Sequence, residues 1–196
     1  MLIDHAVSRQ NQQKHTLVAL VENKPGVLNR VASLFRRRNF NIDSLAVGTT
    51  DDPKISRMTI VVDANKTNAT MVANNLFKLV NVIDVQDVTQ QPSVARDLAL
   101  IKVKATPEQR AQVNNLAEIF RARIVDVAAD SVIVEVTGTE EKIEGMIELL
   151  RPIGIMEMVR TGQVAMTRGA YAGIRRTPGA NGNGWHETDE SGLAEY

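Results

Sequence analysis

The chain has 196 residues, 43% of them apolar, and its 23 Lys and Arg residues are balanced by 23 Asp and Glu residues. Without a basic excess to neutralise phosphates, and with only 4% aromatic residues on which bases could stack, nucleic-acid binding is disfavoured. The absence of cysteine excludes disulfides, thiolate metal sites and a cysteine nucleophile, and suits a reducing compartment, for which we expect the cytoplasm. The length favours two small domains.

The start of the chain is polar. Residues 1–13 carry neither the apolar core of a signal peptide nor an Arg-rich presequence pattern, so they are predicted to be a flexible lead-in. No apolar run approaches the roughly 20 residues that a bilayer-spanning helix requires, so we expect no membrane association.

A strand, a glycine turn and a helix follow. Residues 16–21 are an apolar run rich in β-formers, which Pro25 and Gly26 interrupt. The next apolar residues recur at helical spacing, at Val27, Leu28, Val31, Leu34 and Phe35. A helix is therefore predicted to begin directly after Gly26.

The N-terminus of this helix is a candidate binding site for a small carboxylate, because its first N–H groups lack intrahelical partners and carry the positive end of the helix dipole. Asn23 adds a side-chain amide that both donates and accepts, as the charged groups of an α-amino acid require. The alternative interpretation is that Asn23 merely caps the helix and Gly26 merely turns the chain.

The remainder of the first half predicts a split βαβ unit. Residues 44–48 and 57–62 alternate between apolar and polar as strands of a hairpin do, residues 67–80 have helical spacing with Thr67 as N-cap, and residues 82–88 form a fourth strand. The resulting βαββαβ order is that of a ferredoxin-like domain, which we assign to residues 14–90.

The second half repeats this order of elements after a predicted linker at 91–97. Residues 98–164 contain strand patterns at 98–105, 123–128, 132–136 and 153–160, with helices after Thr106-Pro107 and from Thr139. The fold class is therefore α+β, with two tandem ferredoxin-like βαββαβ domains. Only the first has an Asn-x-x-Gly loop. Residues 165–196 lose periodicity and are rich in Gly, Asn and Pro, which predicts a disordered tail.

Residues for catalysis or metal binding are not apparent. His5, His15 and His186 are far apart, and the chain has neither a P-loop nor a GxGxxG motif, so we predict no catalytic residue, no metal site and no cofactor of its own. An RNA-binding ferredoxin-like sheet would display aromatic residues on its central strands, whereas residues 58–61 are Met, Thr, Ile and Val.

Several short segments of the chain together form a recognisable pattern. In the first half they are 22–31 (ENKPGVLNRV), 41–45 (NIDSL), 50–53 (TDDP) and 56–60 (SRMTI), which resemble the N-terminal ACT domain of the regulatory (small) subunits of acetolactate synthase. In the second half, 120–127 (FRARIVDV) and 137–139 (TGT) resemble the C-terminal domain of that family, and 160–162 (RTG) and 167–169 (TRG) resemble its end. The likeness extends over about residues 14–169.

The resemblance implies a non-catalytic subunit that activates a separate large catalytic subunit and confers feedback inhibition by valine in branched-chain amino-acid biosynthesis. It places thiamine diphosphate, Mg²⁺ and FAD on the catalytic subunit. It also implies a homodimer of ACT domains with valine between them. The valine-binding residues would then be Asn23, Gly26, Val27 and Leu28 of one chain and Asn41 and Ile42 of the other. Ala46 and Gly48 vary from some relatives and leave the preference among valine, leucine and isoleucine open.

Two further interpretations stay open from the residues alone. In the first, the chain is a free-standing ACT-domain sensor that binds an amino acid and acts on another partner. In the second, the chain is an independent enzyme. Co-purification of a thiamine-diphosphate enzyme separates the regulatory subunit from the sensor, and turnover by the isolated chain would reveal an enzyme.

Overall fold

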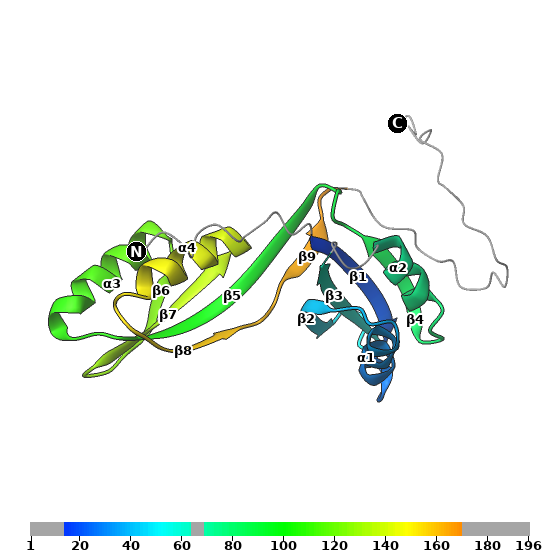
Figure 1. Cartoon of the computed structure of the whole chain (residues 1–196), viewed down its shortest axis with the longest axis horizontal. Helices are drawn as coiled ribbons and strands as arrows, with labels where there is room; N and C mark the ends of the chain where they lie inside the picture. The colour runs from blue at the N-terminus through cyan, green and yellow to red at the C-terminus, as the bar shows by residue number, and fades with distance from the viewer. Residues whose placement is uncertain (1–13, 64–68, 170–196) are drawn as a thin grey trace.

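The computed structural model describes residues 14–63 and 69–169. Two α+β units lie at opposite ends of an elongated molecule, and the long strand β5 runs from the junction between them into the second unit (Figure 1). The predicted lead-in 1–13, the predicted cap Thr67 and residues 170–196 of the predicted tail lie outside the described residues. Within the described part of the chain, every helix is too short or too polar to cross a membrane.

The N-terminal unit has the predicted βαββαβ order. Its elements are β1 (Lys14–Glu22), α1 (Val27–Arg37), β2 (Ile42–Thr49), β3 (Ile55–Asp63), α2 (Ala69–Phe77) and β4 (Val82–Asp87). The strands form an antiparallel sheet in the order β2-β3-β1-β4, which leaves β2 and β4 at the edges. The ferredoxin-like prediction for this half is confirmed.

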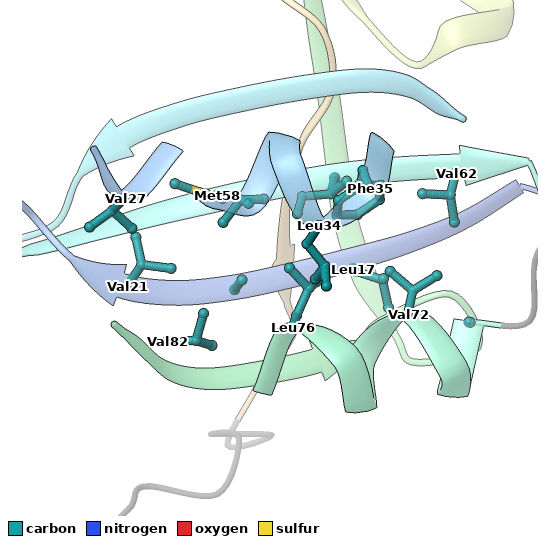
Figure 2. Close-up of a cluster of buried hydrophobic side chains, with 14 residues drawn as sticks. Leu17, Val21, Val27, Leu34, Phe35, Met58, Val62, Val72, Leu76 and Val82 are labelled. Carbon is teal, nitrogen blue, oxygen red and sulfur yellow. The ribbon is translucent and has the colours of Figure 1, made fainter. Parts of the chain in front are cut away.

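The core of this unit lies between the sheet and the two helices (Figure 2). Leu17 of β1, Ile60 of β3 and Leu76 of α2 are fully buried at its centre. Helix α1 contributes the residues expected from its spacing, because Val27, Val31, Leu34 and Phe35 are all buried while the opposite side faces water. Amphipathic spacing therefore places α1 on the sheet.

A left-handed residue ends α1 and directs the chain toward β2. Asn39 has φ 56°, and the N–H of Phe40 donates to the carbonyl of Phe35 at 3.0 Å, which closes the last turn. The rings of Phe35 and Phe40 then meet edge to face, with centroids 5.9 Å apart. This contact positions Asn41 and Ile42, the next two residues.

Helix α2 is shorter than its apolar spacing predicted. It ends at Phe77 rather than at the predicted residue 80, and Val80 is 91% exposed. The N–H of Leu79 donates to Leu76 O at 3.0 Å and that of Val82 to Leu79 O at 3.0 Å, so successive tight turns carry the chain from the helix into β4. The predicted C-terminal end of this helix is thus corrected.

The C-terminal unit repeats the pattern and adds one strand. Its elements are β5 (Ser93–Lys104), α3 (Pro107–Ile119), β6 (Arg123–Val127), β7 (Ser131–Gly138), α4 (Glu140–Leu150), β8 (Ile155–Arg160) and β9 (Val164–Thr167). The main sheet has the order β6-β7-β5-β8. Both predicted helix starts are confirmed, with Thr106 in a capping box with Gln109 and Thr139 accepting from Lys142 N.

The predicted linker and the start of the predicted tail are corrected. Strand β5 begins at Ser93, inside the segment 91–97, and β9 occupies Val164–Thr167, where the tail was expected to begin at 165. The two segments pair with each other, from Ser93 with Thr167 to Arg96 with Val164. Each of these two paired segments is short, and the segment it pairs with is about 70 residues away in the sequence. Local sequence patterns therefore did not predict either strand.

The ribbon of β9 and the start of β5 joins the two units. Ala165 of β9 is buried with Val18 of β1 and Val88, on the face of the N-terminal sheet opposite the helices. Arg57 of β3 donates from Nη2 to Ala165 O at 2.8 Å. The C-terminal unit is thus attached to the sheet that carries the predicted ligand residues.

Candidate functional site

The loop between β1 and α1 is held against the β2–β3 hairpin by Asn23. Its backbone N–H donates to Lys54 O at 2.7 Å, and its side-chain Nδ2 donates to Pro53 O at 2.9 Å. The N-cap position of α1 is occupied by Gly26, without a side-chain hydrogen bond. The alternative in which Asn23 caps the helix is therefore wrong. Its Oδ1 accepts no hydrogen bond from the described residues and remains available to a cationic group.

Gly26 turns the chain into α1 with φ 84°, a left-handed conformation that L side chains rarely adopt. A Cβ at this position would meet nothing within 4 Å in the single chain. The glycine is therefore required by the backbone conformation, and the space above it is open.

The first turn of α1 presents an anion-binding geometry. Arg30 N donates to Gly26 O at 3.0 Å and Val27 N to Lys24 O at 3.3 Å, whereas the N–H groups of Leu28 and Asn29 have no intrahelical acceptor. The first turn contains no acidic residue. A carboxylate placed here gains two N–H donors and the positive end of the helix dipole.

The side chains of the predicted loop residues differ in what they can contact. Val27 is only 4% exposed and belongs to the core, so it can meet a ligand only through its backbone. Leu28 is 46% exposed and offers an apolar surface beside the open N–H groups. Asn23 and Gly26 are exposed as well.

Asn41 and Ile42 lie at the other end of β2. Ile42 pairs with Val62 of β3, whereas Thr49, at the far end of β2, pairs with Ser56, next to the Asn23 loop. The 11 residues of α1 span about 16 Å between the two groups. One chain does not bring all six predicted residues together.

Sequence reasoning missed a charged network where the two units meet. Lys14 Nζ lies 2.8 Å from Asp43 Oδ2 of β2 and 2.7 Å from Glu140 Oε1 of α4. Partial burial by itself would lower the pKa of Lys14, but the hydrogen bonds and charges of Asp43 and Glu140 outweigh it and hold that pKa above its ordinary value. Lys14 thus bridges both units as a cation.

A tight turn lies beside this bridge. Gln163 N donates to Ser44 Oγ of β2 at 2.9 Å, and Thr16 Oγ1 of β1 donates to Gln163 Oε1 at 3.2 Å. The preceding Gly162 has φ 80°, and a Cβ on it would lie 2.6 Å from Ser44 Oγ. The segment Arg160-Thr161-Gly162, which carried part of the family resemblance, was the only sequence signal for this contact.

Among residues 14–63 and 69–169, no group of three or more His, Cys, Asp or Glu side chains is placed to hold a metal ion.

Comparison with known proteins identifies the family. Residues 17–84 match the family model of the AHAS small subunit-like ACT domain, and residues 96–169 match that of the small subunit of acetolactate synthase. The chain is 56% identical over 156 residues to a probable acetolactate synthase small subunit of Archaeoglobus fulgidus, covering 80% of this chain and 98% of that protein. The chain belongs to the acetolactate synthase small-subunit family.

Other small subunits of this family agree. The acetolactate synthase small subunit of Bacillus subtilis is 45% identical over 157 residues, which cover 80% of this chain and 91% of that protein. The crystal structure of the small subunit from Thermotoga maritima is 40% identical, with a TM-score of 0.73 over 80% of this chain and 98% of that one. The family resemblance is confirmed. A small subunit of acetolactate synthase is a regulatory subunit. Membership of this family therefore implies that the chain has a catalytic subunit as its partner.

Proposed function

We propose that this chain activates the catalytic subunit of acetolactate synthase and makes it sensitive to feedback inhibition by valine. The observation that carries the proposal is the open N-terminus of α1, with the N–H groups of Leu28 and Asn29 beside Asn23, in the ACT domain of a small subunit. This arrangement suits the two charged ends of an α-amino acid.

A homodimer completes the site. Strand β2 is an edge strand of the described sheet, so its outer backbone groups are open to pairing with another strand. Two β2 strands that pair antiparallel about a twofold axis bring the Ile42 end of one beside the Thr49 end of the other. Because the Asn23 loop neighbours Thr49, Asn41 and Ile42 of the second chain then face that loop. This supports a valine site at the dimer interface.

Each part of valine has a matching group in this arrangement. The carboxylate lies at the N–H groups of Leu28 and Asn29, and the ammonium group lies near Asn23 Oδ1. The isopropyl group packs between Leu28 and Ile42 of the second chain, both of which have accessible apolar surface. The chemistry of pyruvate condensation, with thiamine diphosphate, Mg²⁺ and FAD, belongs to the catalytic subunit, in the cytoplasm.

Reconstitution tests the proposal. Valine should bind the purified chain in calorimetric titration and tighten its self-association in sedimentation, since ligand and dimer are thermodynamically linked. The chain alone should make no acetolactate from pyruvate, whereas adding it to the catalytic subunit should raise the rate and render it valine-sensitive. Acetolactate formation by the isolated chain, or a catalytic subunit unaffected by it with and without valine, would contradict the proposal.

The free-standing sensor remains the second candidate, because the ACT domain by itself would serve either role. Affinity capture of the tagged chain from its own cells separates the two. The regulatory subunit brings down the large thiamine-diphosphate enzyme, and the sensor brings down a different protein.

A further inference from the structure

We propose that Lys14 and Gly162 are positioning residues that transmit occupancy of the effector site to the C-terminal unit through strand β2. The inference rests on the proposed valine site, because Asn41 and Ile42 immediately precede the two β2 residues that Lys14 and Gly162 contact. Those two residues are Asp43 and Ser44.

The first connection is the ion pair of Lys14. The register of β2 against β3 shifts between Ile42 and Ser44, so Asp43 is the extra residue of a bulge. Its carboxylate and that of Glu140 face the same ammonium group of Lys14 from the two units. A displacement of the Ile42 end of β2 therefore moves Asp43 and changes the charge environment of the first turn of α4.

The second connection is the turn at Gly162. A Cβ on Gly162 would lie only 2.6 Å from Ser44 Oγ, so the backbone of the turn lies directly against β2. The hydrogen bond from Gln163 N to Ser44 Oγ fixes the register of this contact. Only glycine at position 162 combines the positive φ with this proximity.

Both connections end on helix α4. Glu140 contacts Lys14 directly, and Glu144, one turn later on the same helix face, accepts from Arg160 Nη1 at 2.6 Å. Arg160 in turn belongs to the strand that leads into Gly162. The contacts of Asp43 and Ser44, which are adjacent in β2, thus both lead to helix α4. We therefore expect α4 to be the element of the C-terminal unit that responds to a movement of β2.

The space between the two connections leaves room for movement. A polar cavity of about 540 Å³ lies at the junction, lined from both units by residues that include Lys14, Thr16, Asp43, Glu140, Arg160 and Gln163. Polar contacts around open space can exchange partners without the loss of close packing that would accompany movement in an apolar core. The apolar contact of Ala165 with Val18 and Val88 meanwhile keeps the units together.

Coupling of this kind requires valine to favour one position of β2 over another. The test uses the full-length chain with its catalytic subunit and four variants. Lys14→Met removes the charge and keeps a long side chain, Lys14→Arg restores the charge, and Gly162→Ala forces the turn away from Ser44. Arg123→Met is the control, since it breaks a surface ion pair with Glu135 on β7, away from the junction.

Calorimetry measures valine affinity, the acetolactate assay measures the fraction of activity that saturating valine removes, and hydrogen exchange measures the response of α4 to valine. Lys14→Met and Gly162→Ala should bind valine within about twofold of wild type. The fraction of their activity that saturating valine removes should be at least about fivefold smaller than in wild type, with no valine-dependent change of exchange in α4. Lys14→Arg and Arg123→Met should behave like wild type.

Wild-type inhibition and a wild-type response of α4 in Lys14→Met and Gly162→Ala would overturn this inference alone. Failure of the wild-type chain to bind valine would instead overturn the proposed function on which the inference rests. A purely structural role for Lys14 predicts loss of stability without the separation of valine binding from inhibition, and that result also contradicts the inference.

Discussion

Arg160 donates from both Nε, at 3.0 Å, and Nη2, at 2.6 Å, to a single oxygen of Asp97, whose side chain is only 7% exposed. The other oxygen of Asp97 accepts from Thr161 Oγ1 at 3.2 Å. Burial by itself would lower the pKa of Arg160, but the hydrogen bonds and charges of Asp97 and Glu144 hold it above its ordinary value. The start of β5, the end of β8 and helix α4 are thus tied together where the two units meet.

Removal of Asp97 should therefore destabilise the C-terminal unit. Asp97→Ala leaves the partly buried Arg160 guanidinium with Glu144 as its charged partner and removes two charge-assisted hydrogen bonds, which costs about 2 kcal/mol. We expect this loss in the free energy of unfolding from denaturant titration. Arg123→Met, which breaks an exposed pair, should cost less than about 1 kcal/mol. Equal losses in the two variants would show that the Asp97 pair contributes no more than a surface pair.

Substitution of Gly26 should separate valine binding from activation. Gly26→Asp and Gly26→Ala both place a side chain on a residue with φ 84°, at a cost of about 1–2 kcal/mol. Only Asp adds a negative charge at the α1 N-terminus, where repulsion of the valine carboxylate should weaken binding at least about a hundredfold. Calorimetry with valine measures this difference, and Gly26→Ala is the matched control. Wild-type affinity in Gly26→Asp would place the ligand elsewhere.

The Gly26→Asp variant should still activate the catalytic subunit, because we expect the two subunits to contact each other through another surface of the chain. The measurement is acetolactate formation by the mixed subunits at increasing concentrations of the variant, without valine. Loss of activation at concentrations where the variant is folded would assign the Asn23 loop to the subunit interface as well.

Asp84 gives a pH-dependent prediction. Desolvation raises the pKa of this β4 carboxyl above its ordinary value, against the opposing hydrogen bonds of Val85 and Gln86. The charged form of Asp84 is therefore disfavoured in the folded state. Its ionisation costs folding stability: this cost is absent below the ordinary pKa of the carboxyl and grows as the pH rises through the folded pKa. Asp84→Asn should raise the melting temperature at pH 7, and the gain should vanish near the acidic end of the titration. If Asp84→Asn raised the melting temperature equally at pH 7 and at the acidic end, the gain would have a cause other than the ionisation of Asp84.

Truncation after Gly169 should leave folding and valine response intact. The family match ends at residue 169. The alignment with the Archaeoglobus fulgidus protein spans 156 residues and covers 98% of that protein, which therefore has little sequence that could correspond to residues 170–196 of this chain. Thermal unfolding and the valine titration of the truncated chain should both match those of the full chain. A melting temperature lowered by several degrees would show that residues beyond 169 contact the fold.

Local sequence determined the start of α1 after Gly26, the caps at Thr106 and Thr139, and the apolar face of α1, because the spacing of apolar residues and the chemistry of helix ends act over a few residues. The loop proposed to bind valine was likewise predicted from local sequence, since Asn23 and Gly26 are only three residues apart. Only the tertiary structure decided which residues at the junction meet. Lys14 and Glu140 are 126 positions apart, and Ser93 pairs with Thr167, so neither contact leaves a periodic signal. Such pairs depend on the path of the whole chain, and the same path places Asn41 and Ile42 at the opposite end of β2 from the Asn23 loop.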